Sequence, residues 1–263
     1  IYFMALAVAT IGSIVGRLGL DNAVLRFAAT HSSKKEWYRV MGVHNLAFKI
    51  GLLGSGLVSL FLFLCAEWIA KLIFANEDIT TVLRLMFLTI IPFSILNLEA
   101  QTLKGMKKII DASLLQSVLV PSLMLVLFYL VGAHKGILEI TWIYLIAVIM
   151  TFLVGLFRCQ VIIMPLVDKE KPDFPLEVLR DSCKHLYPVA LINAAIIPWG
   201  PLIILGFWAS PDETGIFAAA TRISMLVSIL LTSIVHVLAP IFAQLYSKGE
   251  LNALARVYRF SCI

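Results

Sequence analysis

The sequence predicts an all-α, polytopic membrane protein, because its composition, the length of its apolar segments and the placement of its basic residues all indicate that class. Hydrophobic residues make up 60% of the 263 residues and charged residues only 14%. A soluble domain typically has about 45–50% apolar and about 25% charged residues. Each helical crossing needs roughly 20 mostly apolar residues, so the chain is long enough for several crossings. We therefore expect lipid to be the solvent for most of it.

The apolar segments predict about seven helical spans and the start of another. They lie at roughly 1–28, 43–70, 82–103, 110–132, 138–164, 186–208 and 215–245. They are continuously apolar and longer than the strands of about 9–11 residues that build membrane barrels, which favours helices. The first apolar run has already begun at Ile1, and the sequence stops at Ile263 without a helix cap. We interpret both ends as truncations.

The segments between the spans fall into two sets that differ in charge. One set contains about a dozen Lys and Arg residues, in the regions 34–39, 104–108, 169–184 and 248–256. The alternate set contains little more than Lys71 and Lys135. Basic residues are retained on the cytoplasmic side of membrane proteins, so we expect the first set to face the cytoplasm. The net charge of +5 is then a mark of topology and does not indicate nucleic-acid binding.

The longest polar break, about 168–185, contains Pro172 and Pro175 and predicts a boundary between two helical bundles. We expect residues 1–165 to form a first bundle that lacks its first span, 166–185 to be a cytoplasmic linker, and 186–263 to start a second, truncated bundle. A weak internal repeat supports this division. Residues 27–32 (FAATHS) and 242–247 (FAQLYS) end spans that point the same way, as in transporters built from parallel repeats.

Small residues and prolines within the spans predict close helix contacts and kinks. Gly12 and Gly16 form a small-xxx-small pattern, and Gly51, Gly54 and Gly56 give the second apolar segment a thin face. Five prolines lie within spans and suggest kinks: Pro92, Pro121, Pro198, Pro201 and Pro240.

Ionisable residues inside the spans are the candidate functional residues, because Arg or Asp at a helix centre costs about 2.5–3.5 kcal/mol on insertion scales. Arg222 stands out: Ser233 and His236 lie near the same helical face and could line an aqueous cavity with it. A guanidinium there suits a pyrophosphate or an anionic sugar, since it donates in a bidentate fork. The alternative is an Arg222 that extends to the outer interface.

The first span has three charged residues. Arg17 and Asp21 are one turn apart and could pair, which could be a purely structural contact. Arg26 falls on roughly the opposite face from Arg17, so one cavity can hold both only if the helix bends at Gly16 or Gly19. For Arg26, an interfacial position and a substrate role remain open.

Three further candidates lie in other spans. Lys49 enters the second span and is a candidate for the substrate cavity. Glu99 could carry a coupling proton or could pair with Lys104. His236 could titrate near neutral pH or have only a structural role.

Sequence motifs that are typical of soluble enzymes are absent. The four cysteines are widely spaced, and there is no phosphate loop, H-E-x-x-H zinc motif or G-x-S-x-G elbow. We therefore expect no catalytic residue, no metal and no cofactor, and a transporter in preference to an enzyme.

Three stretches resemble the polysaccharide-biosynthesis flippases of the multidrug/oligosaccharidyl-lipid/polysaccharide exporter superfamily. They are 19–27 (GLDNAVLRF), 103–107 (LKGMK) and 213–222 (ETGIFAAATR), the last followed by 238–250 (LAPIFAQLYSKGE). The likeness covers essentially the whole sequence, in order, as family spans two to eight and the start of nine. One departure is that Gly200 and Pro201 follow Trp199, where many relatives have an acidic residue.

The resemblance implies two pseudo-symmetric six-helix bundles in the full-length protein, around a cationic cavity that alternates between inward-open and outward-open states. It implies a flippase for polyprenyl-diphosphate-linked oligosaccharides of O-antigen, capsule or exopolysaccharide, in a bacterial or archaeal cytoplasmic membrane. The implied partners are the lipid-linked oligosaccharide, membrane lipids, a glycan polymerase and chain-length proteins, with no nucleic acid. Arg17, Arg26 and Arg222 are the positions that the resemblance places at the substrate. A cation-coupled multidrug exporter of the same superfamily and a membrane-bound glycan polymerase or transferase are the alternatives.

Overall fold

The computed structural model describes residues 2–71, 79–131, 136–166, 172, 174–210 and 212–224, and these residues contain helices and no strand. The all-α prediction is confirmed. In chain order the α-helices are α1 (Tyr2–Gly16), α2 (Leu20–Ser33), α3 (Trp37–Leu64), α4 (Ala66–Ile69), α5 (Thr80–Leu88), α6 (Ile90–Gly105), α7 (Ile109–Ser113), α8 (Leu119–Val131), α9 (Ile137–Ile163), α10 (Leu176–Ala190) and α11 (Ile197–Trp208), joined in places by the π-helices η3 (Leu114–Val118) and η5 (Leu191–Ile196) and the 3-10 helix η4 (Met164–Leu166). A further helix covers 212–224.

Among the described residues, five helices are long and apolar enough to cross a membrane, and a bent pair makes a sixth candidate. The five are Trp37–Leu64, Thr80–Gly105, Ile109–Val131, Ile137–Leu166 and Leu176–Gly206. With the bent pair, they match the first six predicted segments. The seventh, 215–245, begins in the helix at 212–224, and its remainder lies outside the described residues.

The first predicted segment, 1–28, is not one continuous helix. It consists of α1 and α2, whose axes differ in direction by 52° across the break at residues 17–19. The bend between Gly16 and Gly19 that the sequence left as a condition for a cavity shared by Arg17 and Arg26 is therefore present. Residues beside a break have backbone groups that need new partners, so such positions in membranes are tolerated where protein surrounds them.

Two spans contain a π-helical segment a few residues before a proline. The π-helix η3 precedes Pro121 in α8, and η5 precedes Pro198 in α11. Proline lacks an N–H and its ring clashes with the carbonyl four residues earlier, so a wider turn before it relieves the clash. The helix α10 begins at Leu176, inside the region 166–185 that the sequence predicts to be a linker.

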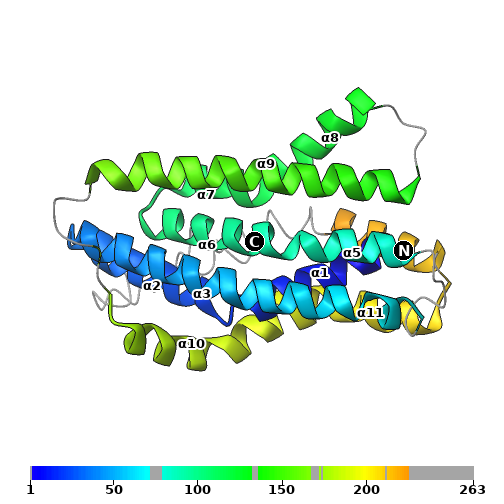
Figure 1. Ribbon diagram of the computed structural model, residues 1–263, viewed down its shortest axis with the longest axis horizontal. Coiled ribbons are helices and arrows are strands. Elements are labelled where there is room, and N and C mark those ends of the chain that lie inside the picture. The colour runs from blue at the N-terminus through cyan, green and yellow to red at the C-terminus, as the bar shows by residue number, and fades with distance from the viewer. Residues whose placement is uncertain are drawn as a thin grey trace, which may run out of the picture. The chain divides into compact units, whose positions relative to one another are not determined.

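The helix α6 lies at the centre of this arrangement and packs against α1, α2 and α3 on one side and against α9 on the other (Figure 1). Close packing rests on glycine. A Cβ on Gly16 would lie 2.7 Å from the Ser55 Cα of α3, and a Cβ on Gly54 would meet the carbonyl oxygen of Gly16. The close helix contacts predicted from small residues are therefore present at Gly16 and Gly54, which bring α1 and α3 together. It does not extend to Gly56, which has open space around it.

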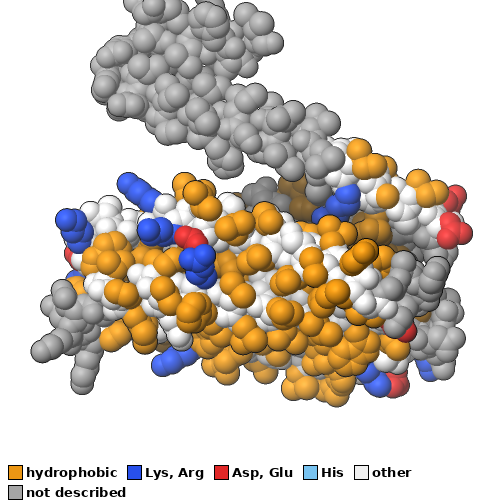
Figure 2. Space-filling view, turned by 90° about the horizontal axis from the view of Figure 1, so that it is seen from above, with side chains coloured by type: hydrophobic (Ala, Val, Ile, Leu, Met, Phe, Trp, Pro, Cys, Tyr) orange, Lys and Arg blue, Asp and Glu red, His pale blue; other side chains and the backbone are white. Residues whose placement is uncertain are grey.

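Hydrophobic side chains cover the outside of the helices as well as the core. Leu53 and Leu57 of α3, Leu125 of α8 and Phe157 of α9 are all more than half exposed. Figure 2 shows hydrophobic side chains over much of the middle of one face, with Lys and Arg mostly toward the left-hand end. A soluble fold would bury such residues, so this surface suits contact with lipid chains.

The α2–α3 connection, the α6–α7 connection and the start of α10 lie at one end of the helices (Figure 1). We call it the cationic end, because it contains Lys34, Lys35, Lys107, Lys108 and Arg180. These residues belong to the set predicted to face the cytoplasm.

Residues Ile1–Ala209 form one compact unit, and Ser210–Ile263 form another. The division of the full-length protein into bundles at 166–185 stays a prediction.

Candidate functional site

Arg17 is a buried cation at the break between α1 and α2. It is 5% exposed, and its Nε donates to Asp21 Oδ2 at 2.8 Å. Its Nη1 donates to the Ser13 hydroxyl at 2.5 Å, and Ser94 of α6 donates to that same hydroxyl at 3.1 Å. The predicted Arg17–Asp21 pair is confirmed, and the structure extends it into a polar centre of four side chains, Ser13, Arg17, Asp21 and Ser94.

The backbone at the break explains how this centre forms. Leu18 and Gly19 have φ values of 51° and 78°, in the left-handed region where glycine is favoured. Gly19 also lies directly against α10, because a Cβ there would be 2.9 Å from the Tyr187 Cα. Asp21 falls in the first turn of α2, where a carboxylate is favoured by the helix dipole, and its Oδ1 is buried without a hydrogen-bond partner.

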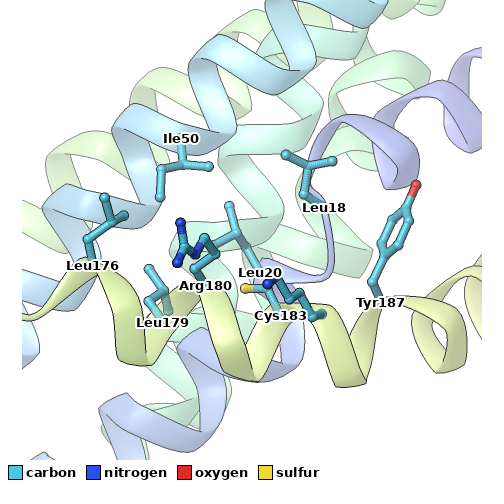
Figure 3. A pocket seen from close by; sticks show the side chains of 9 residues that line it. Leu18, Leu20, Ile50, Leu176, Leu179, Arg180, Cys183 and Tyr187 are labelled. Carbon is cyan, nitrogen blue, oxygen red and sulfur yellow. The ribbon is translucent and has the colours of Figure 1, made fainter.

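A cavity of about 380 Å³ lies beside the break, between its residues and the helices α3 and α10. Its apolar lining comes from Leu18 and Leu20 at the break, Ile50 of α3, and Leu176, Leu179, Cys183 and Tyr187 of α10. Two cations of α10, Arg180 and Lys184, complete the lining. In Figure 3 the Arg180 guanidinium points from α10 into the space bordered by Leu20, Leu176 and Ile50. We call this cavity the α10 groove.

Arg26 and Lys49 do not join Arg17. Both side chains are exposed, and neither makes a hydrogen bond or ion pair within the described part of the chain. The Arg26 guanidinium lies 5.6 Å from the centre of the Phe27 ring. The bend at the break therefore does not bring Arg17 and Arg26 into one polar centre.

Glu99 of α6 is fully buried, at 0% exposure, in the contact between α6 and α9. Neither carboxyl oxygen has a hydrogen-bond partner, and a Cβ on Gly155 of α9 would collide with Oε2. The alternative pair with Lys104 does not form. Lys104 instead donates to Gln116 at 2.5 Å, and Gln116 donates to Asn97 at 2.9 Å.

A second polar cluster lies at the cationic end, beside a cavity of about 460 Å³ that is lined in part by His31, Arg39 and Phe174. His31 Nδ1 lies 2.6 Å from Glu36 Oε2, and Arg39 Nη1 lies 3.5 Å from the same oxygen. The hydrogen bond with His31 is the main cause that lowers the pKa of Glu36.

Two candidates belong to the second unit. Arg222 is exposed on the helix at 212–224, and His236 lies outside the described residues. At the start of that helix the Glu213 carboxylate accepts hydrogen bonds from the Ser210 backbone N–H and hydroxyl, both at 2.9 Å, which lower the pKa of Glu213.

Sequence reasoning missed several of these residues. Ser13 could have been found, because it lies one helical turn before Arg17. Ser94, Gln116 and the lining of the α10 groove could not, since only the packing of distant segments brings them together.

The family model described as polysaccharide biosynthesis protein matches residues 1–246. No curated protein and no solved structure is significantly similar to the chain.

Proposed function

Since the chain belongs to the family of polysaccharide biosynthesis proteins, we propose that the full-length protein is a flippase for polyprenyl-diphosphate-linked oligosaccharides. It would move these units by alternating access across a bacterial or archaeal cytoplasmic membrane, for assembly of O-antigen, capsule or exopolysaccharide. The lipid-linked oligosaccharide is the proposed substrate, and a glycan polymerase and chain-length proteins are the proposed partners.

The observation that carries this proposal is the buried guanidinium at the break in the first span. Charged residues within membrane helices are costly and commonly mark substrate or ion pathways. Broken helices are also a recurrent feature of transporter binding sites, because irregular backbone is tolerated where it lines a cavity. The polar centre at Arg17 combines a buried charge with a broken helix, and the apolar α10 groove lies beside it.

Charge complementarity supports an anionic substrate. Arg26 and Lys49 have no acidic partner within the described residues and are available to a pyrophosphate or an anionic sugar. Arg17 is committed to Asp21 and Ser13 in this conformation. It would contact substrate only in a state in which the Arg17–Asp21 pair has opened, which gives Asp21 a gating role.

Glu99 is the proposed coupling residue. A carboxylate without donors in an apolar contact is strongly disfavoured, so we propose that Glu99 is held there as the neutral acid. Separation of α6 from α9 would admit water and permit release of the proton. Such coupling would also serve a cation-coupled multidrug exporter, the runner-up function.

Export of lipid-linked glycan in cells that lack their own flippase tests the proposal. Wild-type protein should restore glycan on the outer face of the membrane. Replacement of Arg222, the remaining substrate candidate, with Ala should abolish export while the protein still folds and inserts. Arg158→Ala is the control, because Arg158 is an exposed cation of α9 that lies 3.6 Å from Asp111.

Wild-type export by Arg222→Ala would remove the role of that residue. Two further results would contradict the flippase proposal itself. Efflux of cationic drugs without glycan export moves the protein to the multidrug class. Acceptor-dependent glycan synthesis by the purified protein identifies a polymerase or transferase.

A further inference from the structure

We propose that the α10 groove binds the phosphate-bearing end of a single-chain prenyl lipid. Arg180 and Lys184 would contact the phosphate, and the apolar lining would contact the first part of the prenyl chain. The inference rests on the proposed function and adds a subsite for the lipid end of the substrate. None of the residues that carry it is a substrate candidate from the sequence.

The two cations of the groove are free to bind an anion. Arg180 and Lys184 are both exposed, and neither has an ion pair or a side-chain hydrogen bond within the described part of the chain. Asp181 lies on the same helix, but it does not line the groove. The spacing of four residues puts both cations on one side of α10, where a guanidinium and an ammonium can contact one phosphate.

The remainder of the groove is apolar. Its other lining residues are aliphatic side chains, a cysteine and a tyrosine, and the Leu20 and Leu179 side chains are almost fully buried there. A volume of about 380 Å³ is at the lower end of the usual range for small-molecule sites, roughly 300–1,000 Å³. It suits a segment of one chain next to its phosphate better than the two chains of a phospholipid.

The groove is in direct contact with the break. Leu18 of the break and Leu20, directly after it, both line the groove, and Gly19 packs against the backbone of Tyr187. A lipid in the groove would therefore contact the segment that holds Arg17 and Asp21. Binding of the phosphate end could then favour the conformation in which that pair opens, since a ligand shifts an equilibrium toward the state that it binds better.

Binding to the purified full-length protein in nanodiscs tests this directly. The probe is a photoactivatable polyprenyl monophosphate, with the matching prenol and a photoactivatable phosphatidylglycerol as competing chemistries. Two variants perturb the groove. Arg180→Gln/Lys184→Gln removes the phosphate contacts at exposed positions, and Cys183→Trp fills the cavity. The matched control, Lys107→Gln/Lys108→Gln, removes two exposed cations from the same end of the molecule outside the groove.

We expect the polyprenyl phosphate to crosslink to α10 and to the residues around Leu20. The prenol should bind about tenfold more weakly or worse, because it lacks the charged hydrogen bonds. The Arg180→Gln/Lys184→Gln variant should weaken phosphate binding by about tenfold or more, and the Lys107→Gln/Lys108→Gln variant by less than about threefold. Cys183→Trp should reduce crosslinking of both prenyl probes.

Equal labelling by phosphatidylglycerol would show an ordinary bilayer-lipid contact and overturn the inference. So would crosslinks that avoid α10, or equal binding by the groove variant and its control. These outcomes are separate from the flippase proposal. If wild type exports glycan but the groove variants bind and export normally, the subsite is wrong and the flippase stands. If the groove binds prenyl phosphate but no glycan crosses the membrane, the subsite stands and the flippase is wrong.

Discussion

Replacement of Asp21 by Asn should strongly destabilise the protein, because it leaves the Arg17 guanidinium buried without its counter-charge. The two side chains are only 6% and 15% exposed, and the Nε to Oδ2 distance is 2.8 Å. Breaking a buried pair from one side costs about 3–5 kcal/mol, whereas replacing both partners with apolar residues of similar size is often neutral or stabilising. We therefore expect Asp21→Asn to lose about 3–5 kcal/mol of unfolding free energy, and Arg17→Met/Asp21→Leu to recover most of it.

The Glu67–Arg84 pair provides the control. Its nitrogen–oxygen distance of 2.7 Å is close to the 2.8 Å of the Arg17–Asp21 pair, but the Glu67 and Arg84 side chains are 62% and 40% exposed. Exposed pairs contribute about 0.2–1 kcal/mol, so Glu67→Gln should cost no more than that. Reversible unfolding in mixed detergent micelles, followed by circular dichroism, measures all three variants. A loss for Asp21→Asn no larger than for Glu67→Gln would refute a buried, mutually dependent pair.

Three further predictions concern packing, pH and coupling. Gly16→Ala should destabilise the protein by about 1–3 kcal/mol in thermal unfolding, because its new methyl group would meet the backbone of α3. In the control Gly56→Ala the methyl group meets open space, so this variant should be neutral or slightly stabilising. Equal effects of the two substitutions would contradict the close contact at Gly16. The hydrogen bond with His31 lowers the pKa of Glu36 below its ordinary value of 4.5. The stability that it gives is therefore present above about pH 4.5 and lost as the pH falls through the lowered pKa. Glu36→Gln should remove this part of the melting-temperature profile, and an unchanged profile would argue against it. Glu99→Gln should keep the fold, since the neutral acid and the amide are nearly isosteric, but lose any dependence of export on a proton gradient; retained dependence would exclude Glu99 as the coupling residue.

The spans were predictable because each is a local property of the sequence. In lipid, a run of about 20 apolar residues forms a helix, because a helix pairs the backbone N–H and C=O groups of the segment with one another. The Arg17–Asp21 pair was also predictable, since residues four apart on a helix are neighbours. The ends of the helices were less predictable. The helix α3 begins at Trp37 and α10 at Leu176, both before the apolar segments predicted for them. The reason is that the end of a membrane helix at the interface can be amphipathic, and is then helical without being apolar.

The candidate site was only partly predictable, as Glu99 and Lys104 show. They lie five residues apart on one helix, and the sequence permits a pair between them. The structure puts the Glu99 carboxyl under Gly155 of α9 and gives Lys104 to Gln116. The partner of each was decided by which helix packs on that side of α6, and no local pattern encodes this.

By itself, the sequence determined the solvent of this protein, the number and approximate limits of its described spans, the end at which its cations gather and the pair at Arg17. These follow from the cost of placing polar backbone or charge in lipid, which depends on residue type and short spacing. Only the tertiary structure decided that the first span breaks in the left-handed turn at Leu18 and Gly19, and that this turn packs against α10 to form a groove with Arg180 and Lys184. Contacts between distant segments depend on the shapes of both surfaces, and two surfaces meet only when the chain has folded.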